Sequence, residues 1–176
     1  MSNIWFTADM HLGHDNIRKF CNRPFESVDE MDKKLISNWN EVVGENDTIY
    51  HLGDFCFGDS HHYKNSLNGM IIFIRGSHDI IADPYMMIIE PTGLLDEYGN
   101  KRTIVLCHYA MRSWPLSHYA SWHLFGHHHG RLEEYGLSFD VGTDTNNFYP
   151  YSLKGVEKRM SKLTPIVDFR GKQKNG

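Results

Sequence analysis

The 176-residue sequence predicts one α/β domain in which a core of β-sheet carries helices on its outside. Two observations support this fold class. The first half of the chain mixes strand-like and helix-like segments, whereas the second half is rich in strand-like segments. No internal repeat, low-complexity stretch or linker interrupts the chain, and its length is typical of one domain. We therefore place a single domain at residues 1–169 and a polar C-terminal tail at residues 170–176.

Short apolar runs predict the strands. We expect a first buried strand near the N-terminus and a series of further strands along the chain. The predicted strands are residues 4–8, 48–52, 70–74, 86–90, 94–97, 102–107, 122–125 and 137–141. A turn at Gly99-Asn100 is expected to join the strands at 94–97 and 102–107.

Two helices are predicted from capping and periodicity. Residues 27–30 read Ser-Val-Asp-Glu, a capping-box pattern that marks the start of a helix. Apolar residues then recur at spacings of three and four, which gives the helix one apolar face; they are Val28, Met31, Leu35, Trp39 and Val42. Gly44 is expected to end this helix. A shorter helix is predicted over residues 152–162.

Charge, cysteines and hydropathy exclude several classes of protein. The chain has 18 Lys and Arg against 22 Asp and Glu, a net charge of −4, so it shows no strong nucleic-acid-binding signature. The three cysteines are odd in number and form no CxxC, so we expect reduced thiols rather than a disulfide framework or a zinc ribbon. The N-terminus does not resemble a signal peptide, and no apolar run is long enough to cross a membrane. We therefore expect a cytoplasmic protein without a membrane partner.

The sequence contains 12 histidines, and imidazole is the commonest side-chain metal ligand and proton carrier near neutral pH. Five predicted strands end in polar clusters, and strand ends in layered α/β folds collect at one edge of the sheet, where ligands bind. The clusters are Asp9-Met10-His11, Gly53-Asp54, Gly76-Ser77-His78-Asp79, His108 and Gly126-His127-His128-His129. Together they supply enough carboxylates and imidazoles for two metal ions that share a carboxylate.

In order and in type, these five clusters resemble the motif set of the calcineurin-like metallophosphoesterases. The resemblance extends from residue 9 to residue 129, most of the chain. The segments 11–14 and 20–24 are similar to those of the small bacterial and phage-type members. The resemblance implies a four-layer α/β/β/α sandwich with a two-metal site in the loops.

The resemblance also implies a role for each motif residue. The first metal would be held by Asp9, His11 and His129. Asp54 would bridge both metals, and the second metal would be held by His108, His127 and the residue at position 77, which is Ser77. His78 would protonate the leaving group or stabilise the transition state, with Asp79 orienting it. His14 and Arg112 are candidate substrate-phosphate contacts, although a surface role fits each of them as well.

The chemistry implied by the resemblance is hydrolysis of a phosphoester. A hydroxide bridging two divalent cations would attack phosphorus in line. Imidazole and carboxylate ligands without thiolate suit Mn, Fe, Zn, Co or Ni, and we expect Mn. The expected activity is that of a phosphodiesterase or phosphatase on small or nucleotide-like substrates.

Position 77 departs from the family pattern, which has Asn there. A serine hydroxyl is shorter and donates more weakly to a metal, so we expect the second site to be weakened. Two other functions remain open. One is a binding scaffold that kept the fold and lost catalysis, a route for which a retromer subunit with this fold is the precedent. The other is a nuclease. Retention of His78 opposes the scaffold, and the acidic charge opposes the nuclease.

Overall fold

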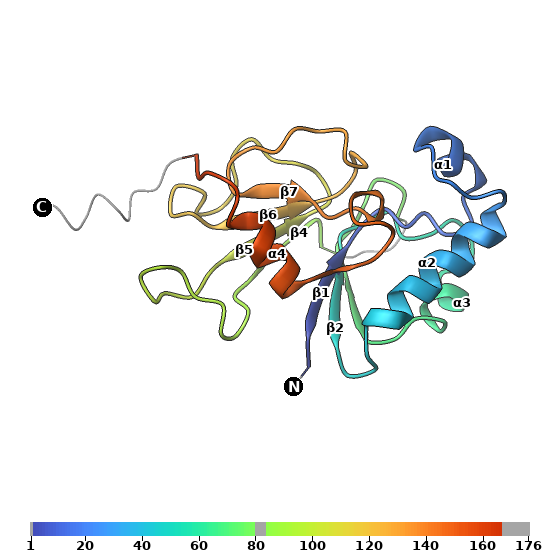
Figure 1. Ribbon diagram of the computed structural model, residues 1–176, viewed down its shortest axis with the longest axis horizontal. Helices are drawn as coiled ribbons and strands as arrows, with labels where there is room; N and C mark the ends of the chain where they lie inside the picture. The colour runs from blue at the N-terminus through green and yellow to red at the C-terminus, as the bar shows by residue number, and fades with distance from the viewer. Residues whose placement is uncertain (1, 80–83, 167–176) are drawn as a thin grey trace, which may run out of the picture.

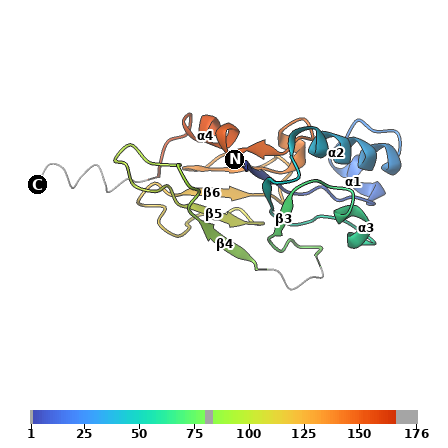
Figure 2. The same cartoon turned by 90° about the horizontal axis from the view of Figure 1, so that it is seen from below.

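The structure is a computed structural model, and it describes residues 2–79 and 84–166. The polar tail predicted at residues 170–176 lies outside the described residues. Two four-stranded sheets form the centre of the molecule, and helices flank them (Figures 1 and 2). This arrangement confirms the predicted fold class, an α/β domain in which helices flank two sheets.

The first sheet has the strand order β3-β2-β1-β8. Strands β1 (Ile4–Thr7), β2 (Thr48–His51) and β3 (Met70–Phe73) run parallel. A two-residue strand, β8 (Tyr151–Ser152), pairs antiparallel with β1 and is too short to show a sequence signal. Because β1, β2 and β3 are parallel, the segments that follow them emerge at the same edge of the sheet.

The second sheet has the order β4-β5-β6-β7. Its strands β5 (Ile104–Cys107), β6 (Trp122–Phe125) and β7 (Ser138–Asp140) are parallel, and β4 (Met86–Ile89) pairs antiparallel with β5. An isolated parallel bridge joins Ala8 to Gly142. That bridge brings the segments after β1 and β7 together, so both sheets deliver their carboxyl ends to one place.

Helix α2 (Val28–Val42) follows its predicted course. The Ser27 hydroxyl accepts a hydrogen bond from Glu30 N at 3.1 Å, and the helix ends just before Gly44. Helix α4 (Leu153–Met160) is capped by Ser152, whose hydroxyl accepts a hydrogen bond from Gly155 N at 3.0 Å. Three further helical segments were not predicted because they are too short for periodicity to show; they are α1 (Asp15–Phe20), α3 (Ser60–Lys64) and the 3-10 turn η1 (Thr143–Thr145).

Two apolar clusters form the core. One fills the space between the sheets and is closed by Val156 and Met160 of α4. The other packs Met31, Leu35 and Trp39 of α2 against the first sheet. Helices α1, α2 and α3 accordingly gather at the side of the first sheet in both views (Figures 1 and 2). No helix in the described part of the chain is long and apolar enough to cross a membrane.

The prediction of a strand at residues 94–97 is wrong. The segment forms a single antiparallel bridge between Leu95 and Lys101. The Asp96 carboxylate accepts hydrogen bonds from the backbone N–H groups of Tyr98 and Asn100, at 2.9 and 2.8 Å. These side-chain bonds organise a compact turn in place of a hydrogen-bonded ladder.

The outer face of the second sheet is covered by the irregular segment 109–121. Val105 and Phe125 point to that face and are buried. The ring of Trp114 lies 5.4 Å from that of His123, which the sheet also presents outward. An aromatic loop therefore supplies the apolar cover on this face.

Candidate metal centre

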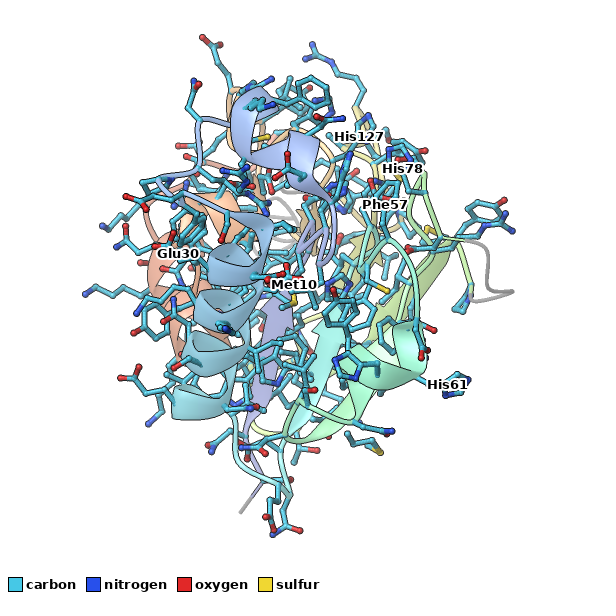
Figure 3. The ribbon with its side chains drawn as sticks, turned by 90° about the vertical axis from the view of Figure 1, so that its right-hand side faces the viewer. Met10, Glu30, Phe57, His61, His78 and His127 are labelled. Carbon is cyan, nitrogen blue, oxygen red and sulfur yellow. The ribbon has the colours of Figure 1, made fainter. Side chains whose placement is uncertain are left out.

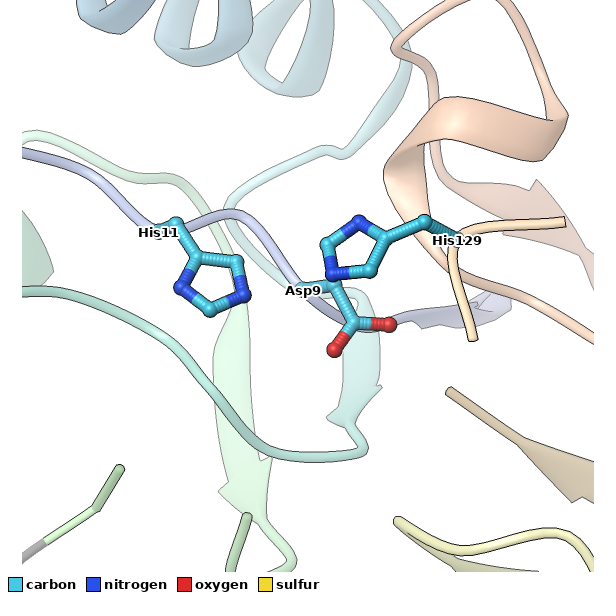
Figure 4. Close-up of side chains that lie close together, drawn as sticks. All are labelled: Asp9, His11 and His129. Atoms are coloured by element: carbon cyan, nitrogen blue, oxygen red, sulfur yellow. The ribbon is translucent and has the colours of Figure 1, made fainter. Parts of the chain in front are cut away.

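Six of the predicted metal ligands meet at the carboxyl edge of the two sheets, in two groups of three. In each group the candidate ligand atoms all lie within 4.8 Å of one another. The first group is Asp9, His11 and His129 (Figure 4), and the second group is Asp54, His108 and His127. The segments that follow β1, β2, β5 and β6 provide these residues, as expected from the strand-end clusters.

The backbone of these segments is unusual. Five of the six residues have a positive φ angle, a region that side chains other than glycine rarely adopt. The angles are 57° for Asp9, 51° for His11, 55° for Asp54, 71° for His127 and 50° for His129. Such conformations are retained where the surrounding structure holds them, and they concentrate at functional sites. Here they turn successive donor groups toward one point.

Two glycines allow the chain to close around the carboxylates. A Cβ atom at Gly76 would lie 2.3 Å from both the backbone N and Oδ1 of Asp54. A Cβ atom at Gly126 would lie 2.6 Å from Asp9 Oδ2. Both contacts are too short for any side chain, so the glycines in the GSHD and GHHH motifs are required by packing around the site.

The Asp54 carboxylate lies between the two groups. Its Oδ2 atom is 3.4 Å from His108 Nε2 in the second group and 3.7 Å from His11 Nε2 in the first. Its other oxygen, Oδ1, accepts a hydrogen bond from the backbone N–H of His78 at 2.8 Å. One carboxylate oxygen thus faces both groups, as a bridging ligand would.

Hydrogen bonds orient two of the imidazoles. His108 Nδ1 lies 2.8 Å from the carbonyl oxygen of Leu52, and His129 Nδ1 lies 2.7 Å from Asp144 Oδ2. Each bond uses Nδ1 and leaves Nε2 turned toward the site. Metal-binding histidines are oriented in this way by the groups behind them.

Several buried polar atoms in the site have no hydrogen-bond partner. They include Asp9 Oδ1, His11 Nε2 and His108 Nε2, and Asp9 itself is 0% exposed. A buried polar atom without a partner is unfavourable by about 1–3 kcal/mol. Atoms of this kind, on carboxylate and imidazole groups that converge, are what a divalent cation would satisfy. The residues present therefore fit a metal site.

The charges of the site depend on burial and on neighbours. Burial raises the pKa of Asp9 to about 7 and lowers that of His11 to about 3. Burial also opposes the charged forms of Asp54 and His129, but their partners outweigh it. Hydrogen bonds and the neighbouring His108 keep the pKa of Asp54 below its ordinary value, and Asp144 raises the pKa of His129 to about 10.

The structure places Ser77 and His78 beside Asp54. The Ser77 hydroxyl donates a hydrogen bond to Asp54 Oδ2 at 2.8 Å. His78 Nε2 lies 4.0 Å from the same oxygen, and about half of the His78 side chain is exposed. Both residues therefore border the candidate metal centre, with the His78 ring at its open side.

The Asp79 carboxylate binds backbone N–H groups and not the His78 ring, which the family resemblance implied it would orient. Its carboxylate accepts hydrogen bonds from the backbone N–H groups of Asp54, Phe55 and Gly76, at 2.8, 3.2 and 2.8 Å. These N–H groups lie in the segments that follow β2 and β3, so the strands fix their positions. The Asp79 carboxylate is bonded to them. Asp79 thus ties together the loops after β2 and β3 that carry Asp54 and His78.

A cavity of about 280 Å³ opens onto the centre. The predicted substrate contact His14 lines it, and its ring stacks on that of Phe57 at 4.1 Å. In Figure 3, Phe57, His78 and His127 are seen in the upper right part of the view, and the exposed His61 is seen apart from them, lower on α3. Phe57 had no sequence signal as a site residue, because its place depends on the fold.

The other predicted phosphate contact, Arg112, is not brought to this cavity. Its guanidinium lies 4.0 Å from the ring centre of Tyr135 and lines a separate pocket on the outer face of the second sheet. Arg131, which sequence reasoning did not select, lines the cavity instead, together with the exposed Phe20. Arg131 donates a hydrogen bond to the carbonyl of Phe20. Its position directly after the GHHHG motif was the available signal.

Comparison with known proteins agrees with this geometry. A family model described as calcineurin-like phosphoesterase matches residues 2–167. An uncharacterized protein of Methanocaldococcus jannaschii is 37% identical over 174 residues, which are 92% of this chain and 93% of that protein. The gene 66 protein of Mycobacterium phage L5 is 36% identical over 85 residues, which are 45% of this chain and 41% of that protein.

Among solved structures, a protein of unknown function from Aquifex aeolicus has the same fold. Its TM-score is 0.66 at 22% sequence identity, and the match covers 90% of this chain and all of that one. At this level of identity the likeness concerns the fold alone.

Proposed function

Since the chain belongs to the calcineurin-like phosphoesterase family, a family of metal-dependent phosphoester hydrolases, we propose that it hydrolyses small phosphoesters with two divalent cations. The observation that carries this proposal is the Asp54 carboxylate. Its Oδ2 atom faces His11 of one ligand group and His108 of the other. A carboxylate oxygen that faces two ligand groups can bridge two cations about 4 Å apart, the spacing of two-metal hydrolases.

The ligand sets follow from the two groups. Asp9, His11 and His129 would hold one cation, and Asp54, His108 and His127 would hold the other. Bound there, the cations would polarise the phosphoryl oxygens and lower the pKa of water. Imidazole and carboxylate donors suit several first-row metals, and we propose Mn²⁺.

His78 is the proposed proton donor to the leaving group. Its ring stands at the open side of the centre and lines the cavity where a substrate would enter. It has no strong hydrogen-bond partner that would fix its proton elsewhere in the described part of the chain. Imidazole transfers protons readily near neutral pH, so a leaving alkoxide held beside His78 would be protonated as it departs.

The substrate proposed is a small or nucleotide-like phosphodiester or phosphomonoester. Arg131 places a guanidinium at the cavity, where it can contact a phosphate oxygen. Phe20 is 62% exposed and Phe57 is 38% exposed, so both present aromatic surface beside the cavity. A flat leaving group such as a nucleobase or an aryl ring would stack on such surface.

A metal titration tests the proposal. The metal-free chain would be titrated with Mn²⁺ and assayed with bis(p-nitrophenyl) phosphate and with p-nitrophenyl phosphate. We expect hydrolysis that depends on Mn²⁺ and a kcat lower by about 10²-fold or more in His78→Ala. His61→Ala is the matched control, because it removes an exposed imidazole on α3, away from the cavity. Unchanged turnover in His78→Ala would contradict its assigned role.

Ser77→Asn should be assayed beside the native chain. Because Ser77 already donates to Asp54 Oδ2, we propose that position 77 limits the second metal site. The asparagine variant should bind the second Mn²⁺ more tightly and turn over faster. Equal metal binding and turnover would refute this idea. No metal-dependent hydrolysis by either protein would instead favour a binding scaffold with this fold.

A further inference from the structure

Arg23 has a buried side chain that links several segments around the candidate metal centre. Its side chain is 0% exposed, and its guanidinium N–H groups all have partners. Nε and NH2 donate to the two oxygens of Asp144, each at 2.8 Å. NH2 also donates to the carbonyl of Asp9 at 2.7 Å, and NH1 donates to the carbonyl of Met10 at 2.8 Å and to the sulfur of Met31 at 3.4 Å. Arg23 and Asp144 are 121 positions apart in the sequence, so only the fold brings them together.

Two of these bonds hold the backbone that carries two members of the first metal group. The carbonyls of Asp9 and Met10 lie between Asp9 and His11, which both have positive φ angles. A segment in this strained conformation needs external contacts to keep it there. Arg23 provides them, from the loop between α1 and α2.

The bidentate bond to Asp144 reaches the third member of that group. Asp144 Oδ2, which accepts from Arg23, also lies 2.7 Å from Nδ1 of His129. The carboxylate thereby fixes the orientation of the ring and leaves Nε2 free for a cation. Arg23 in turn fixes the carboxylate in plane, since a bidentate guanidinium pair has a defined geometry.

A purely structural role accounts poorly for this pair. A buried ion pair is often no more stabilising than apolar residues of the same volume, because desolvation offsets the attraction. Here the side-chain contacts of the pair, apart from that to Met31, end on the first metal group or on Met10, which joins Asp9 to His11. The opposite charges of Arg23 and Asp144 also compensate each other, so the pair adds no net charge beside the site.

We propose that Arg23 and Asp144 are positioning residues that together preorganise the first metal site, holding Asp9 and His11 through the backbone and His129 through its ring. The inference rests on the proposed two-metal function. It assigns no role to Arg23 or Asp144 in the second group, Asp54, His108 and His127, and this difference makes it testable.

The experiment is a Co²⁺ titration of the full metal-free chain, followed by visible absorption and by calorimetry. His129→Ala and His127→Ala identify which binding event belongs to which group. In Asp144→Asn and Arg23→Lys, we expect the affinity for the first-site Co²⁺ to fall by about 10- to 100-fold, while the second event keeps its affinity. Glu134→Gln is the control, because it alters an exposed pair with Arg159 away from the site.

A double variant separates positioning from general stability. If Asp144 acts through His129, adding Asp144→Asn to His129→Ala should leave Co²⁺ affinity where His129→Ala alone puts it. Two-site binding with native affinities in both Asp144→Asn and Arg23→Lys would overturn this inference and leave the proposed function standing. An equal loss at both sites, with a lower melting temperature, would show a merely structural pair and also overturn it. Failure of the native chain to bind Co²⁺ would overturn the proposed function itself.

Discussion

The two ends of the parallel strands in the first sheet differ in how the carboxylates of their buried aspartates are hydrogen-bonded. Asp47, directly before β2, is 6% exposed, and its carboxylate accepts bonds from Asn3 N at 2.7 Å, Trp5 Nε1 at 2.9 Å and Gly44 N at 3.0 Å. Asp9, just past the end of β1, is fully buried, and its Oδ1 has no partner. The hydrogen bonds at Asp47 lower its pKa to about 2, although burial opposes them, whereas burial raises that of Asp9 to about 7.

The difference shows how a fold can separate stability from function. At the amino ends of β1 and β2, neutral donors satisfy the Asp47 carboxylate and join two segments of the chain, residues 3–5 and 44–47. At the carboxyl ends, strained backbone and glycine packing bring carboxylates and imidazoles together and leave Asp9 Oδ1, His11 Nε2 and His108 Nε2 without hydrogen-bond partners. A buried carboxylate oxygen left without a donor, as Asp9 Oδ1 is, is compensated well by a cation, so the second arrangement fits a metal site.

The largest expected effect is on activity at the carboxyl end. Asp54→Asn should lower kcat/KM by about 10³-fold or more, because it removes the carboxylate charge shared by both ligand groups and with it several kcal/mol of transition-state stabilisation. Asp47→Asn should leave kcat/KM within a few-fold of the native value. Steady-state kinetics at saturating Mn²⁺ measure both, and similar losses in the two variants would break the comparison.

Metal binding should stabilise the fold. A ligand that binds only the native state adds about 2.7 kcal/mol at a concentration of 100 times its Kd. We expect Mn²⁺ to raise the melting temperature and a chelator to reverse the rise. The rise should persist in Asp47→Asn and shrink in Asp54→Asn. A melting temperature that does not respond to Mn²⁺ would contradict the metal site.

At the amino end, Asp47→Asn should reduce the free energy of unfolding by about 1 to 2 kcal/mol at neutral pH. Because the folded pKa of Asp47 lies below the ordinary 3.8, this stabilisation is present above about pH 4 and is lost as pH falls toward 2. The difference in unfolding free energy between native and variant should therefore shrink steadily between pH 4 and pH 2.5. Urea unfolding at pH 7, 4 and 2.5 measures it, and a difference independent of pH would refute the assignment.

The smallest effect has the opposite sign. The folded pKa of Asp9, about 7, lies above its ordinary value, so its contribution to stability is present below about pH 4 and lost as pH rises through 7. In metal-free protein at pH 8, Asp9→Asn should therefore be more stable than the native chain. The same variant should bind Mn²⁺ poorly. Chemical unfolding with and without Mn²⁺ tests this, and a less stable metal-free variant would contradict it.

Much of the scaffold could be predicted because its signals are local. Short apolar runs mark β1, β2, β3, β5 and β6, and the Ser27 capping pattern with its apolar spacing marks α2. The strand prediction for residues 94–97 is wrong because the Asp96 side chain takes backbone N–H groups that a strand would pair. A pattern of apolar residues does not reveal such side-chain hydrogen bonds. The order of motifs along the chain likewise predicts the six residues that the structure gathers in two groups.

By itself, then, the sequence determined the fold class, the family and the candidate metal-ligand residues. Strand periodicity and motif order can be read directly from the order of residues. Only the tertiary structure decided which carboxylate lies between the groups, that Asp79 holds backbone rather than His78, and that Arg131 rather than Arg112 reaches the cavity. It also paired Arg23 with Asp144, 121 positions away. These contacts join distant segments, and their partners are chosen by how two sheets pack, which no local pattern encodes.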